Sequence, residues 1–209
     1  MSKNGVILIG AGGHARSCID VIEQDGRYRV AGLIGNLSEV GGKCNGYTVL
    51  AGDDELQSLS RDFQYALVAV GQTSSATLRI KLFLLARSFG FKLPVIIAPT
   101  AYVSRHALIG DGSIVMHGAT VNASAKVGCN CIINSHSLIE HDAVVADHCH
   151  ISTGAIVNGS AQVGMGSFLG SGAILRDGKT IGTNCVIGMG QQVLHNLESN
   201  TIIRNQKHI

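Results

Sequence analysis

The sequence is poor in the residues that build large aromatic or charged surfaces. Of its 209 residues, 4% are aromatic, none is Trp, and 14% are charged, with a net charge of +2. So weak a charge, without a Lys/Arg-rich run, excludes the basic surface that nucleic-acid binders need. No apolar run approaches the roughly 18 residues of a membrane-spanning helix. Two prolines against 27 glycines favour tight, regular packing of small residues.

The cysteines and the N-terminus predict a cytoplasmic protein with reduced thiols. The first residues, MSKNGVILIG, lack the pattern of a signal peptide. The cysteines show no zinc-ribbon spacing, so we interpret them as free thiols. They are Cys18, Cys44, Cys129, Cys131, Cys149 and Cys185.

The first part of the chain alternates strand-like and helix-like segments. Strands are predicted at 5–10, 28–35 and 65–71, and helices at 14–26 and 74–90. In the second helix we expect Leu78, Leu82 and Leu85 on one apolar side. This alternation predicts a small parallel sheet with crossover helices, a Rossmann-like half-domain over residues 1–93.

The second part follows a strict six-residue period. From Ile97 to Val193 every sixth residue is aliphatic, and from Ala101 to Ala173 the residue two positions earlier is always Ala, Ser or Cys. This pattern predicts a hexapeptide-repeat parallel β-helix over residues 94–209. Three hexapeptides form one coil, so residues 18 apart stack about 4.8 Å above one another.

A glycine-rich loop follows the first predicted strand. GAGGHA, residues 10–15, has the G-x-G-x-x-G/A spacing and opens a helix. Glycines let a phosphate approach the backbone, and the helix N-terminus supplies free N–H groups. An acidic residue that would bind a ribose is missing, because the second strand ends at Gly35–Asn36. We therefore favour a nucleotide-linked ligand smaller than NAD, with a plain strand-to-helix turn as the alternative.

The stretch NSHSLIEHD, residues 134–142, concentrates ionisable groups inside the repeat. In the six-residue frame Ile139 points inward, and His141 and Asp142 lie at the following turn. A carboxylate that orients an imidazole is the arrangement of a general base. His150 lies half a coil away from His141, so the two could meet only across a contact between neighbouring β-helices.

Three segments together resemble one family of bacterial enzymes. GAGGHA, APTAYVSRHALIGDG (98–112) and INSHSLIEHD (133–142) with the coils that follow are similar to the sialic acid O-acetyltransferase and nucleotide-aminosugar N-acetyltransferase family of hexapeptide-repeat sugar acyltransferases. The resemblance implies a left-handed β-helix, a homotrimer, acetyl-CoA bound between adjacent helices, and a nucleotide sugar on the N-terminal domain. We expect no metal, nucleic-acid or membrane partner.

The resemblance also implies roles for individual residues. His141 falls on the catalytic base, with Asp142 as its partner. The residues that fall at the cofactor site are Asn134, His150, Gly170 and Gly188. Those at the sugar-nucleotide site are Gly10, Gly12, Gly13 and His14, with Asn36 beside them.

The implied mechanism is direct attack of a sugar amine or hydroxyl on the thioester. His141 removes the proton, and a backbone N–H near Gly170 or the side chain of His150 stabilises the oxyanion. Arg176 and Lys179 are candidates for the CoA phosphates.

Three departures from the family pattern leave the acceptor open. They are Gly35–Asn36 in place of an acidic pair, Ala98–Pro99 in place of His-Pro, and the ending TIIRNQKHI in place of a Gly-x-Pro-Ala tail. We expect N-acetylation of a nucleotide-linked 4-amino sugar. Alternatives are O-acetylation of free or CMP-linked sialic acid, a γ-carbonic-anhydrase-like zinc enzyme using His136 and His141, and a non-catalytic scaffold.

Overall fold

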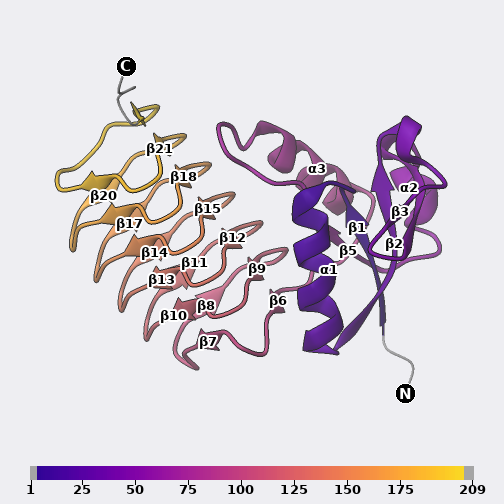
Figure 1. Ribbon diagram of the computed structural model, residues 1–209, viewed down its shortest axis with the longest axis horizontal. Coiled ribbons are helices and arrows are strands. Elements are labelled where there is room, and N and C mark those ends of the chain that lie inside the picture. Colours follow the sequence, from indigo (N-terminus) through magenta and orange to yellow (C-terminus); the bar gives the residue numbers. More distant parts are fainter. Residues whose placement is uncertain (1–3, 205–209) are drawn as a thin grey trace.

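The computed structural model describes residues 4–204, in which a five-stranded sheet with its helices packs beside a parallel β-helix (Figure 1). Residues 205–209, part of the C-terminal segment that departs from the family pattern, lie outside this range. Within it, no helix has the length and apolar character needed to cross a bilayer. The cytoplasmic location stays a prediction.

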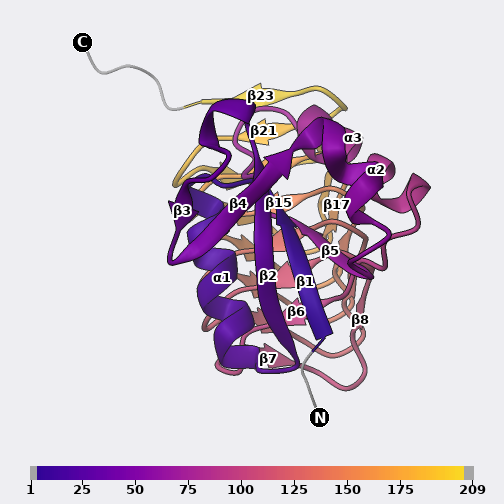
Figure 2. The ribbon, with the colours of Figure 1, turned by 90° about the vertical axis from the view of Figure 1, so that its right-hand side faces the viewer.

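The N-terminal sheet has the strand order β3-β4-β2-β1-β5 (Figure 2). β1, β2, β4 and β5 pair in parallel, as predicted, whereas β3 and β4 form an antiparallel hairpin that the sequence pattern did not predict. The strands are β1 (Asn4–Ile9), β2 (Tyr28–Gly35), β3 (Lys43–Cys44), β4 (Tyr47–Gly52) and β5 (Tyr65–Val68).

The helices agree with the predicted ranges to within three residues, but one buried face differs. Leu78 is 50% exposed, and the buried side of α3 carries Arg79 in its place. The prediction of an apolar face through Leu78 was therefore wrong, because α3 also meets polar groups of the β-helix. The helices are α1 (Gly13–Asp25), α2 (Leu56–Leu59) and α3 (Thr77–Ser88), with 3-10 turns η1 (Leu37–Glu39) and η2 (Asp53–Glu55).

α1 lies between the sheet and the β-helix (Figure 1). Its buried residues, such as Ile19 and Ile22, share one apolar core with Ile114 and Ile132 of the β-helix. The two parts of the chain are therefore packed together through a common core. α3 ends at Ser88 and β6 begins at Ile96, and the division into 1–93 and 94–209 stays a prediction.

The second part is a left-handed β-helix with three parallel sheets of two-residue strands (Figure 1). Strands three apart in the chain pair in register at an 18-residue offset, as Ile139 with Val157 shows. The predicted coil is thus confirmed. The strands are β6 (Ile96–Ile97), β7 (Tyr102–Val103), β8 (Leu108–Ile109), β9 (Ile114–Val115), β10 (Thr120–Val121), β11 (Lys126–Val127), β12 (Ile132–Ile133), β13 (Leu138–Ile139), β14 (Val144–Val145), β15 (His150–Ile151), β16 (Ile156–Val157), β17 (Gln162–Val163), β18 (Phe168–Leu169), β19 (Ile174–Leu175), β20 (Thr180–Ile181), β21 (Val186–Ile187), β22 (Gln192–Val193) and β23 (Ile202–Ile203).

The six-residue pattern builds the interior of the β-helix. Its core consists of the predicted aliphatic residues and the small residues two positions before them. Cys131, Cys149 and Cys185 are fully buried there. The turns between the sheets form three corners, where residues such as Asp142 adopt a positive φ of 59°. Asp and Asn tolerate this left-handed conformation better than other residues with a side chain.

Candidate active site

The glycine loop lines a cavity of ≈ 440 Å³ at the carboxyl ends of the strands. Gly10 has a φ of 124°, and a Cβ there would lie 2.8 Å from Cγ2 of Val70, so only glycine fits. Gly12 and Gly13 face open space. Gly12 caps α1 without a side-chain hydrogen bond, which leaves the first N–H groups of the helix accessible. This arrangement suits an anion such as a phosphate.

The cavity brings together all the residues predicted for the sugar-nucleotide site. Besides the glycines it contains Glu39 and Asp53, two acidic residues that the sequence analysis did not select. Partial burial raises the pKa of Asp53. The predicted residues in its lining are Gly10, Gly12, Gly13, His14 and Asn36.

His14 lines this cavity and has one unpaired ring nitrogen. The residue is half-buried, but its Nε2 is enclosed and has no hydrogen-bond partner within residues 4–204. Burial, together with the nearby charges of Arg79 and His150, lowers the pKa of His14 to about 3. His14 is therefore neutral, and its Nε2 is both unpaired and enclosed.

His150 is held in a buried chain of hydrogen bonds. Its Nδ1 lies 2.6 Å from the carbonyl oxygen of Gln72, and its Nε2 lies 3.1 Å from Nδ2 of Asn134. The backbone N–H of Ser135 donates to Oδ1 of Asn134 at 2.8 Å, which fixes the orientation of that amide. Because a carbonyl only accepts, the His150 proton resides on Nδ1, and Nε2 accepts from Asn134.

This chain of hydrogen bonds corrects the expectation that His150 could stabilise the oxyanion. The side chain is buried under the N-terminal part, because Gln72 covers it. Burial lowers the pKa of His150 to about 4, so Nε2 carries no proton at neutral pH. His150 therefore cannot donate to an oxyanion in this arrangement. Binding of the cofactor by Asn134 and His150 stays a prediction.

His141 and Asp142 form the predicted pair at an exposed corner. Nδ1 of His141 lies 2.9 Å from Oδ2 of Asp142, and their side chains are 65% and 59% exposed. The hydrogen bond to Asp142 raises the pKa of His141. Because the carboxylate holds Nδ1, the other nitrogen, Nε2, is left to take up a proton.

The cleft beside His141 has a volume of ≈ 690 Å³ and contains a glycine that the sequence analysis missed. A Cβ on Gly159 would lie 2.9 Å from Nε2 of His141, so the glycine backbone lies against the ring. Among the described residues, the N–H of Gly159 makes no backbone hydrogen bond. It is therefore a free donor beside the base. The sequence could have indicated this contact, because Gly159 lies 18 residues, or one coil, after His141.

Two other predicted glycines do not have free N–H groups. Gly170 donates its N–H to the carbonyl of Ile187, and Gly188 donates to that of Ile203, both at 2.7 Å. The ladder between coils uses these hydrogen atoms, so neither can hold an oxyanion or a CoA oxygen. A Cβ on Gly170 would lie 2.6 Å from the backbone nitrogen of Met189, so close packing explains this glycine.

The predicted residues thus form two groups in one chain. The glycine loop, His14, Asn134 and His150 lie where the N-terminal part covers the sheet that contains β15, whereas His141 and Asp142 lie at the corner between β13 and β14. His136 occupies a different corner, packed over Gly118. In residues 4–204 no group of three or more His, Cys, Asp or Glu is arranged to hold a metal ion.

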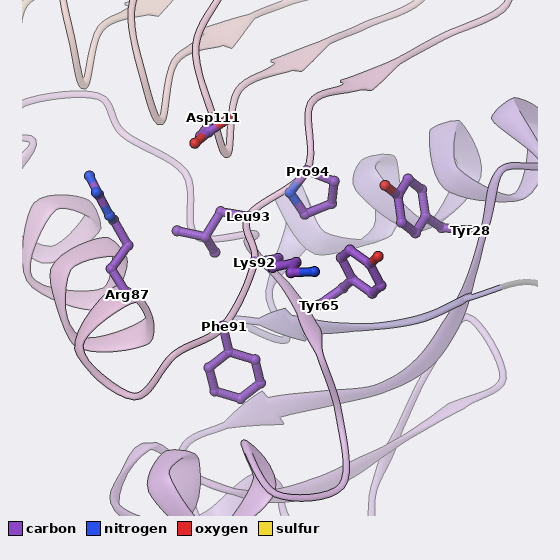
Figure 3. A pocket seen from close by; sticks show the side chains of 8 residues that line it. All are labelled: Tyr28, Tyr65, Arg87, Phe91, Lys92, Leu93, Pro94 and Asp111. Carbon is purple, nitrogen blue, oxygen red and sulfur yellow. The ribbon is translucent and has the colours of Figure 1, made fainter.

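A further cavity of ≈ 400 Å³ contains none of the predicted residues (Figure 3). Tyr28 and Tyr65, which line it, are the first residues of β2 and β5. The cavity therefore lies at the amino ends of the strands, whereas ligands of open α/β sheets bind at the carboxyl ends. The glycine-loop cavity, by contrast, lies at the carboxyl ends of the strands, where this rule places a ligand.

Comparison with known proteins identifies the family. Residues 5–82 match the PglD N-terminal domain. A variant of perosamine N-acetyltransferase from Caulobacter crescentus, solved with CoA and GDP-perosamine, is 31% identical, with a TM-score of 0.91 over 98% of this chain and 95% of that one. The acetyltransferase domain of PglB from Neisseria gonorrhoeae FA1090, solved with acetyl coenzyme A, is 30% identical, with a TM-score of 0.89 over 98% and 97%. The chain belongs to the nucleotide-aminosugar N-acetyltransferase family.

The family relationship makes the chain an acetyl-CoA-dependent sugar acetyltransferase. It supports the N-acetyltransferase side of the predicted resemblance and not the side of sialic acid O-acetyltransferases. WeeI from Acinetobacter baumannii AYE, at 19% identity and a TM-score of 0.72, shares the fold. No curated protein sequence matches the chain.

Proposed function

We propose that the protein transfers the acetyl group of acetyl-CoA to the amine of a nucleotide-linked 4-amino sugar, with His141 as the general base. The observation that carries this proposal is the 2.9 Å contact between Nδ1 of His141 and Oδ2 of Asp142 in an open cleft. The complexes of the perosamine enzyme with CoA and GDP-perosamine support the choice of both substrates.

The reaction is a direct acyl transfer. The sugar nitrogen attacks the thioester carbonyl and forms the C–N bond, while Nε2 of His141 accepts a proton from the nitrogen. Asp142 stabilises the imidazolium ion that results. The N–H of Gly159 is the candidate donor to the developing oxyanion. Collapse of the intermediate breaks the C–S bond, and the proton passes from His141 to the CoA sulfur.

The proposal includes a homotrimer with sites shared between chains. His141 and the glycine-loop cavity occupy separate places in one chain, so a site that uses both requires a neighbouring copy. Closed rings of identical subunits provide such contacts. A cytoplasmic location belongs to the same proposal, and it is supported by the six free thiols.

A panel of acceptors tests the proposed function. Incubation with acetyl-CoA and GDP-, UDP-, dTDP- and CMP-linked amino sugars, followed by mass spectrometry, should show an added acetyl group on the amine of a nucleotide sugar. The His141→Ala variant is the control and should yield almost no product. Acetylation of sialic acid, with all amino sugars unchanged, would contradict the proposal.

A further inference from the structure

A carboxylate occupies the end of β2 although the sequence has no acidic residue there. Glu39, in the turn η1, folds back so that Oε2 accepts hydrogen bonds from the backbone nitrogen of Asn36 at 2.8 Å and from Nδ2 of Asn36 at 3.0 Å. A Cβ on Gly35 would lie 2.8 Å from the same oxygen. The absence of a side chain at Gly35 therefore makes room for the Glu39 carboxylate.

The end of β2 is a known ribose-binding position in sheets that carry a glycine loop. β2 is paired with β1, and the glycine loop follows β1 directly. An Asp or Glu at the end of the second strand binds the ribose hydroxyls of a nucleotide whose phosphates lie at the loop. Glu39 supplies the carboxylate from three residues beyond Asn36. The departure at Gly35–Asn36 thus replaces the acid and does not remove it.

Glu39 is free to bind a ligand from the cavity. The residue is half-buried and lines the same cavity as the glycine loop. Its Oε1 has no hydrogen-bond partner among residues 4–204. The other charged residue of the lining is Asp53, at the end of β4, and the lining contains neither Lys nor Arg. Such a surface selects a ligand that presents hydrogen-bond donors to the carboxylates, while the α1 N-terminus accepts the phosphates.

We propose that Oε1 of Glu39 accepts a hydrogen bond from the ribose 2′-hydroxyl of the nucleotide sugar. The acceptor is then a ribonucleotide-linked amino sugar, such as a GDP- or UDP-linked one, and not a dTDP-linked sugar, which lacks this hydroxyl. This inference rests on the proposed function and specifies its acceptor class.

The Glu39→Gln variant separates this role from a purely structural one. Glu39 also closes the η1 turn by accepting from Asn36. The amide oxygen of Gln can keep that contact, but its second polar group is an NH₂, which can only donate to the hydroxyl in a neutral hydrogen bond. Because a neutral hydrogen bond is weaker than one to a carboxylate, the variant should fold normally and recognise the ribose less strongly. Glu55→Gln is the matched control, because Glu55 is exposed and lies outside the cavity lining.

The test measures binding of nucleotide pairs to the full-length protein by calorimetry. We expect GDP to bind at least about tenfold more tightly than 2′-deoxy-GDP, as a hydrogen bond to a charged group requires. UDP and 2′-deoxy-UDP should show the same preference. In Glu39→Gln the preference for the ribo form should fall several-fold, because a neutral amide replaces the charged carboxylate, and Glu55→Gln should keep the wild-type ratio.

The outcomes separate this inference from the proposed function. Equal binding of ribo and deoxy forms to the wild type, or an unchanged ratio in Glu39→Gln, would overturn the role of Glu39 and leave the acetyl transfer intact. Failure of every nucleoside diphosphate to bind would overturn both, because the glycine-loop cavity would then hold no nucleotide.

Discussion

Two histidines of the β-helix, His150 and His141, occupy opposite environments. His150 is 6% exposed, and both ring nitrogens are committed to hydrogen bonds within the chain. His141 is mostly exposed, and one nitrogen faces a carboxylate while the other is free. Burial lowers the pKa of His150 to about 4, whereas Asp142 raises the pKa of His141. The contrast shows which histidine can exchange protons and which one holds the structure.

The regions around the two histidines also differ in their roles. The region around His150 joins the N-terminal part to the β-helix and shapes the wall of the glycine-loop cavity. The corner of His141 is exposed and borders an open cleft that Gly159 also lines. Changes to either region test this division.

Replacing His141 by Ala should abolish most of the activity. Loss of a general base costs about 10²–10⁴-fold in turnover. Because the side chain is 65% exposed, the melting temperature should not change. Steady-state kinetics and thermal unfolding check both points, with the exposed His195→Ala as control. If His141→Ala kept more than about a tenth of the turnover, His141 would not be the base.

Replacing Asp142 by Asn should shift the pH profile. In the wild type, kcat/KM should fall as the pH drops through the raised pKa of His141, because the protonated ring cannot accept a proton. Without the carboxylate the pKa falls toward about 6.5, so the acidic limb should move to lower pH. The plateau should fall by about 10–100-fold, since the ring loses its orientation. Asn suits the positive φ at this position, which preserves the turn. An unmoved limb would show that Asp142 does not tune His141.

Replacing His150 by Ala should act on stability. The change leaves the carbonyl of Gln72 and the amide of Asn134 without their buried partner. Each unsatisfied group costs about 1–3 kcal/mol, so the free energy of unfolding should fall by at least about 2 kcal/mol. Urea unfolding measures this loss, with His195→Ala as the exposed control. A variant as stable as the wild type would contradict the structural role of His150.

Stability should also depend on pH through the buried histidines. Folded His14 and His150 have pKa values of about 3 and about 4, whereas the unfolded chain protonates histidine near 6.5. As the pH falls from 6.5 toward 4, the unfolded state binds protons that the folded state does not. The free energy of unfolding should therefore decrease over this window and be nearly constant above it. Urea unfolding at several pH values should show a shallower decrease for His150→Ala, and identical slopes would contradict this reasoning.

The regular part of the molecule was predictable because one physical rule governs it. The six-residue pattern places an aliphatic residue of each strand in the core. The inward positions of Ile139 and Cys149, and the position of His141 at a corner, follow from this pattern. The N-terminal part was less predictable, because tertiary contacts override local pattern. Arg79 is buried in place of Leu78 since its guanidinium donates to the carbonyl of Val68 at 3.0 Å and to Oδ1 of Asn130 at 2.8 Å.

In the candidate site, too, contacts between residues far apart in sequence could not be predicted. The pairing of His141 with Asp142 could be predicted because the residues are adjacent in sequence. The covering of His150 by Gln72 could not, because 78 residues separate them. Glu39 was missed because its carboxylate reaches Gly35 only after the turn η1 has formed.

Mixing of two inactive variants tests the central claim that neighbouring chains share the site. His141→Ala removes the base, and Gly12→Asp places a negative charge in open space at the phosphate end of α1 without a clash. Co-refolded in equal amounts, the variants should regain about a quarter of the wild-type activity, because in a closed ring that fraction of contacts joins an intact His141 to an intact loop. Activity no higher than the sum of the separate variants would show that each chain carries its own complete site.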